Sequence, residues 1–368
     1  MDLLEQIALT FTPGLGAASI RKLVDLYPNE NIYSLPPSEL KAAFGNHTEV
    51  ALNIIGKAGM ARAERELRYC EQHHIRPLFF TESAFPARLN RPETTDCPVL
   101  LYALGEAELN PRRSLAVVGT RRATHQGCEL TDKLVEQMQP YGAPIVSGLA
   151  YGIDSAAHKA ALQHKLPTLA VLGHGLDRIY PPENRRLAAE IVGQGGTLLT
   201  EYPAGTAINP RYFPARNRII AALADGVLVV EASEKGGALI TAGIAAGYHR
   251  EVFAIPGRLT DPYSKGTNSL IATNKAILVR TSGDIARQMG WPEPEQAARE
   301  VSQPKLFPSL SAEEQRIVGL IEQREVLTTD ELAELTQLPV SQLAPLLFNL
   351  ELEQVLDCLP GRRYCLKH

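Results

Sequence analysis

A regular alternation of short apolar runs and helical segments between Leu115 and Pro256 constrains the fold more than any other feature. Each run of Val, Leu, Ile and Ala ends in Gly, Ser, Thr or Glu and is followed by a helical pattern. Short, fully apolar strands that alternate with helices predict a parallel sheet covered on both faces. Ligands of such sheets bind beyond the carboxyl ends of the strands. The polar residues after each strand are therefore the first candidates for function.

The alternation predicts an α/β, Rossmann-like domain over residues 69–286. The expected strands lie near 115–118, 143–147, 168–172, 197–201, 226–231 and 251–255, with a short edge strand at 276–279. The expected helices lie near 124–139, 154–165, 183–193, 215–223 and 239–247. Apolar pieces separated by prolines between Ile75 and Gly105 predict a pair of strands that leads into the sheet.

The N-terminal stretch, 1–68, reads as a small helical domain similar to a sterile-alpha-motif (SAM) or helix-hairpin-helix module. Two amphipathic helices flank the turn Thr12-Pro13-Gly14-Leu15-Gly16. In a helix-hairpin-helix the glycines bring backbone amides close to a phosphate, and Ser19, Arg21 and Lys22 would assist. An ordinary helical hairpin explains the pattern equally well, and the sequence leaves both open.

The C-terminal part predicts a linker and a winged helix. Residues 287–309 are rich in Pro, Glu and Gln and have linker composition. Residues 310–368 contain three amphipathic helices, the first with a capping box of Ser311 and Glu314, and then a β-hairpin around Pro360-Gly361.

The charge of this winged helix opposes a role in reading DNA. Between Arg324 and Arg362 there is no Lys, Arg or His, whereas there are seven acidic residues. A DNA-reading winged helix presents a basic helix to the groove. The composition favours contact with a protein.

The composition also limits the class of protein. The net charge of -4 means that nucleic-acid binding would need a local basic patch. The five cysteines form no CxxC pair, which indicates a reducing compartment and no zinc site. No apolar run has the length of a membrane helix, so we expect a cytoplasmic protein without a membrane contact. The motifs for a dinucleotide or for ATP are missing, and no cofactor or metal is expected.

Several predicted strand-to-helix turns carry groups that suit a phosphate. Glycines free the backbone amides, and basic side chains add charge-assisted hydrogen bonds. The residues concerned are Gly119, Thr120 and Arg121 after the first core strand, Ser147 and Gly148 after the second, Gly175 after the third, and Lys235, Gly236 and Gly237 after the fifth. Their convergence on one sheet edge predicts an extended polyanion as ligand.

The segment from Arg211 to Ile220 interleaves aromatic and basic residues, in particular Arg211, Phe213, Arg216, Asn217 and Arg218. Arginines that track phosphates and a ring that stacks on a base are typical of single-stranded nucleic-acid sites. A solvated helix start with Phe213 packed inward is an equal alternative. Because Arg216, Asn217 and Arg218 are consecutive, helical spacing prevents all three from facing the core.

Ser147, Asp154 and His158 also suggest a hydrolase. No G-x-S-x-G elbow is present, and Asp154 and His158 are explained as the cap and first turn of a helix. A structural, anion-binding turn is the preferred interpretation.

With these residues in view, the chain resembles the DNA-processing protein A (DprA, or Smf) family. The resemblance is carried by GTR, SGLAYGIDSAAH, LGHGLDRIYPPEN, TEYPAG, FPARNRIIAAL, VVEASEKGGALITA and FAIPGR, in this order between residues 119 and 258. It implies the three-part architecture above and a non-enzymatic homodimer that binds single-stranded DNA, protects incoming strands and loads the RecA recombinase during natural transformation. It also implies that Arg121, the 211–218 segment and Lys235 form the DNA pocket, although Gly236 replaces the serine of many relatives.

Two other functions remain compatible with the sequence. A phosphoribohydrolase-type enzyme would use Asp154, His158 and Glu201, but its P-G-G-x-G-T-x-x-E stretch is matched only by GQGGTLLTE at 193–201. An adaptor would act mainly through the acidic winged helix.

Overall fold

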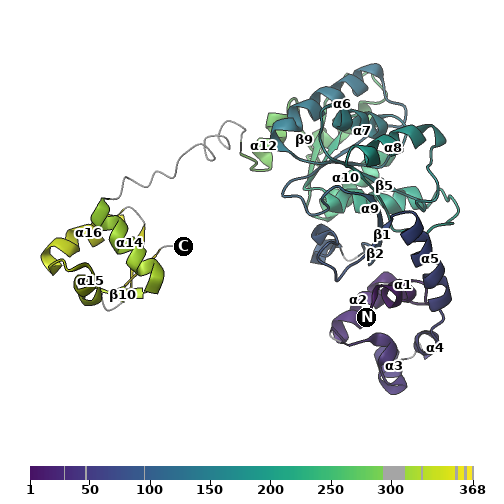
Figure 1. Cartoon of the computed structure of the whole chain (residues 1–368). Coiled ribbons are helices and arrows are strands. Elements are labelled where there is room, and N and C mark those ends of the chain that lie inside the picture. The colour runs from purple at the N-terminus through teal and green to yellow at the C-terminus, as the bar shows by residue number, and fades with distance from the viewer. Residues whose placement is uncertain are drawn as a thin grey trace. The chain divides into compact units, whose positions relative to one another are not determined.

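A computed structural model describes residues 1–28, 30–45, 48–94, 96–292, 311–324, 326–352, 355–359 and 363–366 (Figure 1). The chain divides into two compact units, Met1–Pro294 and Glu295–His368, which are treated separately. Most of the predicted linker, from 293 to 309, lies outside the described residues. Its predicted start at 287 lies inside helix α12 (Ser282–Gln288), and the following Trp291 packs into the core.

The first unit is built on a nine-stranded sheet in the order β1-β2-β6-β5-β4-β3-β7-β8-β9. From β6 to β9 all neighbouring strands are parallel, while β2 is antiparallel to both β1 and β6. The bounds are β1 Arg76–Phe79, β2 Leu100–Gly105, β3 Leu115–Val118, β4 Ile145–Ser147, β5 Thr168–Leu172, β6 Thr197–Thr200, β7 Gly226–Val229, β8 Glu251–Ala254 and β9 Ile277–Leu278. The predicted parallel sheet and its lead-in strand pair are confirmed.

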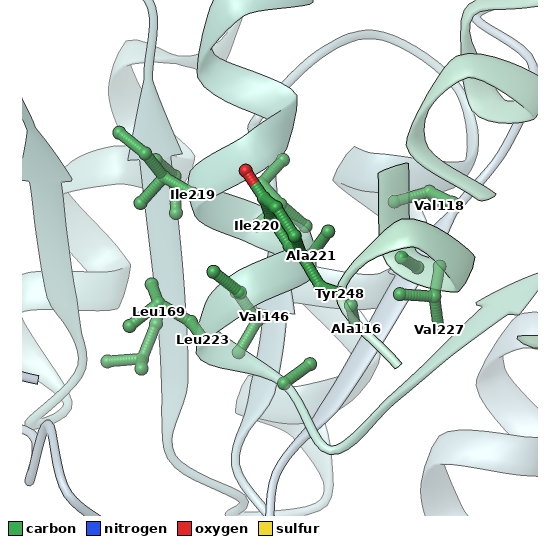
Figure 2. Close-up of a cluster of buried hydrophobic side chains, with 14 of the residues drawn as sticks. Ala116, Val118, Val146, Leu169, Ile219, Ile220, Ala221, Leu223, Val227 and Tyr248 are labelled. Atoms are coloured by element: carbon green, nitrogen blue, oxygen red, sulfur yellow. The ribbon is translucent and has the colours of Figure 1, made fainter. Parts of the chain in front are cut away.

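Helices cover both faces of this sheet. They are α6 His125–Met138, α7 Ile153–Gln163, α8 Arg185–Gly193, α9 Tyr212–Leu223, α10 Gly237–Gly247 and α11 Lys265–Ala272. Successive side chains of a strand point to opposite faces, so Leu115 and Val117 pack with α6 and α7, whereas Ala116 and Val118 pack with α9 and α10. Figure 2 shows the second cluster, with Ile219, Ile220 and Leu223 of α9 beside Val146 and Leu169 of the sheet.

The N-terminal helices share a core with β1 and β2. They are α1 Leu3–Thr10, α2 Ala17–Leu26, α3 Pro37–Phe44, α4 Thr48–Ile55 and α5 Met60–Gln72. Ile7 and Ile20 lie in one buried cluster with Phe79 and Tyr102 of the strands. Helix α5 therefore continues through the domain boundary predicted at residue 68.

Arg21 holds this helical module to the β1–β2 connection, which favours the ordinary helical hairpin over a phosphate role for this residue. Its guanidinium donates to Oδ1 of Asn90 at 2.7 Å and to the carbonyl of Pro98 at 3.1 Å. It also lies 4.8 Å from the centre of the Phe80 ring, in a cation–π contact. A guanidinium with these partners is used in packing.

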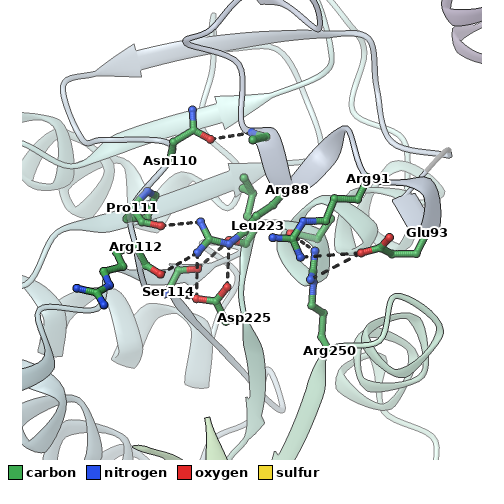
Figure 3. Close-up of polar contacts among 12 residues, drawn as sticks. Arg88, Arg91, Glu93, Asn110, Pro111, Arg112, Ser114, Leu223, Asp225 and Arg250 are labelled. Atoms are coloured by element: carbon green, nitrogen blue, oxygen red, sulfur yellow. Dashed lines mark hydrogen bonds and ion pairs between the residues drawn. The ribbon is translucent and has the colours of Figure 1, made fainter. Parts of the chain in front are cut away.

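A second arginine fixes the β1–β2 connection to the parallel strands (Figure 3). The Arg88 guanidinium forms two hydrogen bonds to the Asp225 carboxylate, at 2.9 and 3.0 Å, and one to the carbonyl of Pro111 at 2.8 Å. Asp225 also accepts from the backbone N–H of Ser114 at 2.8 Å. The ion pair thus joins the lead-in segment to the residues that precede β3 and β7.

The second unit is a winged helix, as predicted. Its elements are α14 Ala312–Arg324, β10 Val326–Thr328, α15 Thr329–Thr336, α16 Val340–Leu352, β11 Leu356–Leu359 and β12 Arg363–Leu366. The strands form an antiparallel sheet in the order β10-β12-β11. Ser311 and Glu314 form the predicted reciprocal hydrogen bonds of a capping box, at 2.8 and 3.3 Å.

Candidate nucleic-acid interface

The strand order places a crevice between β3 and β7. From β3 the chain moves through β4, β5 and β6 on one side, and then returns to place β7 on the other side of β3. Helix connections diverge at such a switch point, so the carboxyl ends of the two strands are left open for a ligand. A pocket of about 310 Å³ lies there.

Eight of the predicted site residues line this pocket, and they come from the turn after β3, from the first part of α9 and from the turn that leads into α10. They are Gly119, Thr120, Arg121, Phe213, Arg216, Asn217, Gly236 and Gly237. The sequence therefore predicted the sheet edge where this pocket lies and about half of the residues that line it.

The turn after β3 is held in place by hydrogen bonds and close packing. The backbone N–H of Thr120 donates to the carbonyl of Glu231 at 2.8 Å. A Cβ atom at Gly119 would lie 2.4 Å from Cγ1 of Ile153, so only glycine fits there. Arg121 follows with an exposed side chain. Its guanidinium carbon lies 5.8 Å from the centre of the Phe213 ring, which brings a cation and an aromatic ring together at the pocket.

The opposite wall is the start of α9, and its aromatic residues are held by other rings. Phe213 is partly exposed and lies 5.5 Å, centre to centre, from the Tyr180 ring. Tyr212 stacks on Tyr202 at 4.3 Å. The contact with Tyr180 packs the Phe213 ring, which stays partly exposed where it lines the pocket.

Arg216 has a different position from the exposed arginine expected from the sequence. It is only 3% exposed, and its Nη1 donates to the carbonyl of Val171 at 2.5 Å. A Cβ atom at Gly148 would lie 1.8 Å from this Nη1, so Gly148 provides the space for the guanidinium. Burial lowers the Arg216 pKa to about 10, and the nearby Asp154 partly opposes that shift. Arg216 therefore supports the pocket from beneath.

Asp154 lies in the pocket wall and is buried. Its predicted place as helix cap is corrected, because Gly152 is the N-cap of α7 and Asp154 belongs to the first turn. Burial raises the Asp154 pKa, while Arg216 and the backbone N–H groups of Ala150 and Gly148 act in the opposite direction. The carboxyl balances the positive charge of Arg216 in this part of the core.

Among the residues considered for catalysis, the Ser147 hydroxyl lies beside the Asp154 carboxyl, but the other groups are held apart by structural partners of their own. His158 is fully buried, shares a 2.7 Å hydrogen bond with Thr168, and has its pKa lowered to about 3 by burial and by Arg216. The Ser147 hydroxyl donates to the carbonyl of Val117 at 2.7 Å. Glu201 is held by two 2.7 Å hydrogen bonds from Arg218. Each group has a structural partner.

The other predicted contacts lie outside the pocket. Ser147, Gly148 and Gly175 are buried, which corrects their assignment as contacts; a Cβ at Gly175 would lie 2.5 Å from the carbonyl oxygen of Pro203. The predicted DNA contact of Arg218 is corrected too, because its guanidinium is paired with the Glu201 carboxylate. This pairing raises the Arg218 pKa, although burial acts in the opposite direction. Arg211 and Lys235 are exposed and do not line the pocket.

Sequence reasoning missed the apolar side of the pocket. Ile240 lines it and is 50% exposed, and Thr241 and Pro214 line it as well. Ile240 lies three residues after Gly237, and residues three apart on a helix share one face. The sequence spacing could therefore have placed Ile240 beside the predicted glycine turn.

Two models of known protein families match most of this chain. The model of the DNA recombination-mediator protein A family matches residues 76–290, and that of the DprA winged helix domain matches residues 300–362. The chain belongs to the DNA recombination-mediator protein A family. The first match covers the sheet domain with all of the pocket residues. The resemblance stated from the motifs is therefore confirmed.

Relatives from several bacteria support the assignment. Protein Smf of Escherichia coli is 38% identical over 82% of each chain. The DNA processing protein DprA of Streptococcus pneumoniae is 44% identical over 52% of this chain and 67% of its own length.

Two solved structures of the family share the fold. The structure of DprA from Streptococcus pneumoniae gives a TM-score of 0.68 at 33% identity, and covers 78% of this chain and 98% of its own. A Helicobacter pylori structure is described as showing a single-stranded DNA binding mode of DNA processing protein A. It gives a TM-score of 0.51 at 31% identity, and covers 58% of this chain and 95% of its own. In the described part of the chain, no helix combines the length and apolar character needed to cross a membrane.

Proposed function

We propose that this protein binds single-stranded DNA at the pocket between β3 and β7. The observation that carries the proposal is the placement of Arg121 against the partly exposed Phe213 ring at a topological switch point. The guanidinium is available to a phosphate and the ring to a base, the two contacts that characterise sequence-tolerant single-strand sites. The single-stranded DNA binding mode described for the Helicobacter pylori protein supports this choice of ligand.

The size of the pocket favours a single strand. About 310 Å³ is near the lower limit for small-ligand pockets, which begins at roughly 300 Å³. An unpaired nucleotide can turn its base into a pocket of this size, whereas a base in a duplex must first leave its stack, at a cost of a few kcal/mol. We therefore expect preference for unpaired strands.

The protein is further proposed to act by binding and not by catalysis. The support is local: His158 is buried and neutral, and Glu201 and Ser147 already serve structural partners. Following the family resemblance, we propose that it works in the cytoplasm as a homodimer that protects incoming strands and loads RecA during natural transformation. The five free cysteines fit a reducing compartment.

Binding of a fluorescent oligo-dT over a salt series tests the proposal, with the same sequence as a duplex beside it. Arg121→Ala should weaken binding to every sequence and reduce the slope of log affinity against log salt by about 0.7, the value for one phosphate contact on a single strand. Arg122→Ala is the matched control, because Arg122 is an exposed neighbour that does not line the pocket. Equal effects of the two substitutions, or preference for the duplex, would refute this placement.

A further inference from the structure

The loop between β8 and α11 presents a basic and an apolar side chain at the same edge of the sheet as the pocket. Arg258 ends the FAIPGR motif, which the proposed function leaves without a role, and Leu259 follows it. Both side chains are exposed, Leu259 to 85%. Because β8 is parallel to β7, its carboxyl end opens on the side where the pocket lies.

Hydrogen bonds hold this loop against the turn that follows β7. The backbone N–H of Ala232 donates to the carbonyl of Tyr263 at 2.7 Å, and that of Gly266 donates to the carbonyl of Ala232 at 2.9 Å. The base of the loop is closed by Asn268, whose side chain bonds both the N–H and the carbonyl of Gly257, at 3.1 and 3.0 Å. The loop is therefore an ordered surface next to the pocket.

The same turn separates the pocket from a second hollow. Ala232 lines the pocket, whereas Glu231 and Arg258 line a neighbouring hollow of about 320 Å³. A strand that leaves the pocket over this turn meets the β8–α11 loop next.

Three exposed cations lie along this route: Lys235 on the β7–α10 turn, Arg258 on the loop, and Lys265 at the start of α11. Within the described residues, none of the three forms an ion pair. Exposed cations without an ion pair, on neighbouring turns of one sheet edge, suit the phosphates of an extended strand.

The carboxylates nearby are mostly engaged. Glu231 is buried and accepts from the N–H of Thr124 at 3.0 Å and from its hydroxyl. Asp261 accepts from the N–H of Tyr263 at 3.0 Å and from the hydroxyl of Ser264 at 2.8 Å. Glu234 is the exposed carboxylate on this route, so the three cations outnumber the free acidic groups.

We infer that a single DNA strand held in the pocket continues over the β7–α10 turn onto the β8–α11 loop, where Arg258 and Lys265 contact phosphates and Leu259 packs against a base. This inference rests on the proposed function. It predicts a site longer than the pocket, with the additional contacts made by residues outside it.

The test compares a short and a long oligo-dT, of about 4 and about 16 nucleotides, the limits typical of such sites. The variant Arg258→Ala/Lys265→Ala should bind the short strand as the wild type does. It should bind the long strand on the order of tenfold more weakly at about 0.1 M salt, with the salt slope reduced by about 1.4 for two lost phosphates. Leu259→Ala should weaken the long strand severalfold and leave the slope unchanged. Lys133→Ala, an exposed cation on α6, is the control.

The outcomes separate the inference from the proposed function. If the wild type binds neither strand, the proposed function fails, and the inference fails with it. If Arg121→Ala loses both strands while Arg258→Ala/Lys265→Ala binds the long strand normally, the function stands and the extended path is wrong. Equal losses on both strands would also overturn the path, since they would place Arg258 and Lys265 at the pocket itself. Unchanged thermal melting of the variant shows that its fold is intact.

Discussion

Replacing Arg216 with methionine should destabilise the protein more than it changes the salt dependence of DNA binding. The guanidinium is buried and donates to the Val171 carbonyl at 2.5 Å. Loss of a hydrogen bond from a charged donor costs about 1.5–3 kcal/mol. The substitution also leaves the buried Asp154 carboxylate without its positive neighbour. Removal of one partner from buried charges costs about 3–5 kcal/mol in total, and we expect a loss in this range near neutral pH.

The loss should depend on pH with a defined sign. Burial already raises the Asp154 pKa, and Arg216 opposes this rise. A carboxyl with a raised pKa in the folded state binds more protons when folded, so its ionisation lowers stability as pH increases. Without Arg216 the pKa rises further. The additional loss in the variant should therefore begin to appear above the raised Asp154 pKa of the wild type and reach its full size above the still higher pKa of the variant.

Urea unfolding of wild type and Arg216→Met at about pH 5 and about pH 8 measures this effect. The free-energy difference should be larger at the higher pH. Asp154→Asn in the Arg216→Met background should recover part of it, as a double-mutant cycle would show. A variant as stable as the wild type at both pH values, with a salt slope reduced as in Arg121→Ala, would refute the reasoning and make Arg216 a phosphate contact.

Three further predictions follow from single contacts. Arg88→Ala leaves the partly buried Asp225 without its ion pair and should lower the free energy of unfolding by about 3 kcal/mol, measured by urea titration; a change below about 0.5 kcal/mol contradicts the network in Figure 3. Phe213→Ala should weaken oligo-dT binding by about 1–3 kcal/mol without changing the salt slope, whereas the exposed Phe348→Ala should have no effect; equal affinities would exclude stacking. Removal of residues 307–368 should leave DNA affinity largely intact, because the described winged helix carries acidic helices; a large loss would show that this part contacts DNA or supports assembly.

The sequence by itself determined the sheet, its helices and the sheet edge at which the pocket lies. The reason is local: apolar runs of strand length alternate with helical periodicity, and parallel strands all end at one edge. The same pattern placed Gly119 and Arg121 in the turn directly after the first core strand. The sequence also predicted the winged helix, from the capping box at Ser311 and Glu314 and from three segments with helical periodicity.

Only the tertiary structure decided which of the predicted residues line the pocket. Arg121 and Gly236 line the same pocket because β7 pairs with β3, and strand order depends on contacts between segments far apart in the chain. Arg216 and Arg218 lie two residues apart on one helix, yet one turns under β5 and the other pairs with Glu201. Helical spacing limits how many of them face inward, but the partner available at each position decides which ones do.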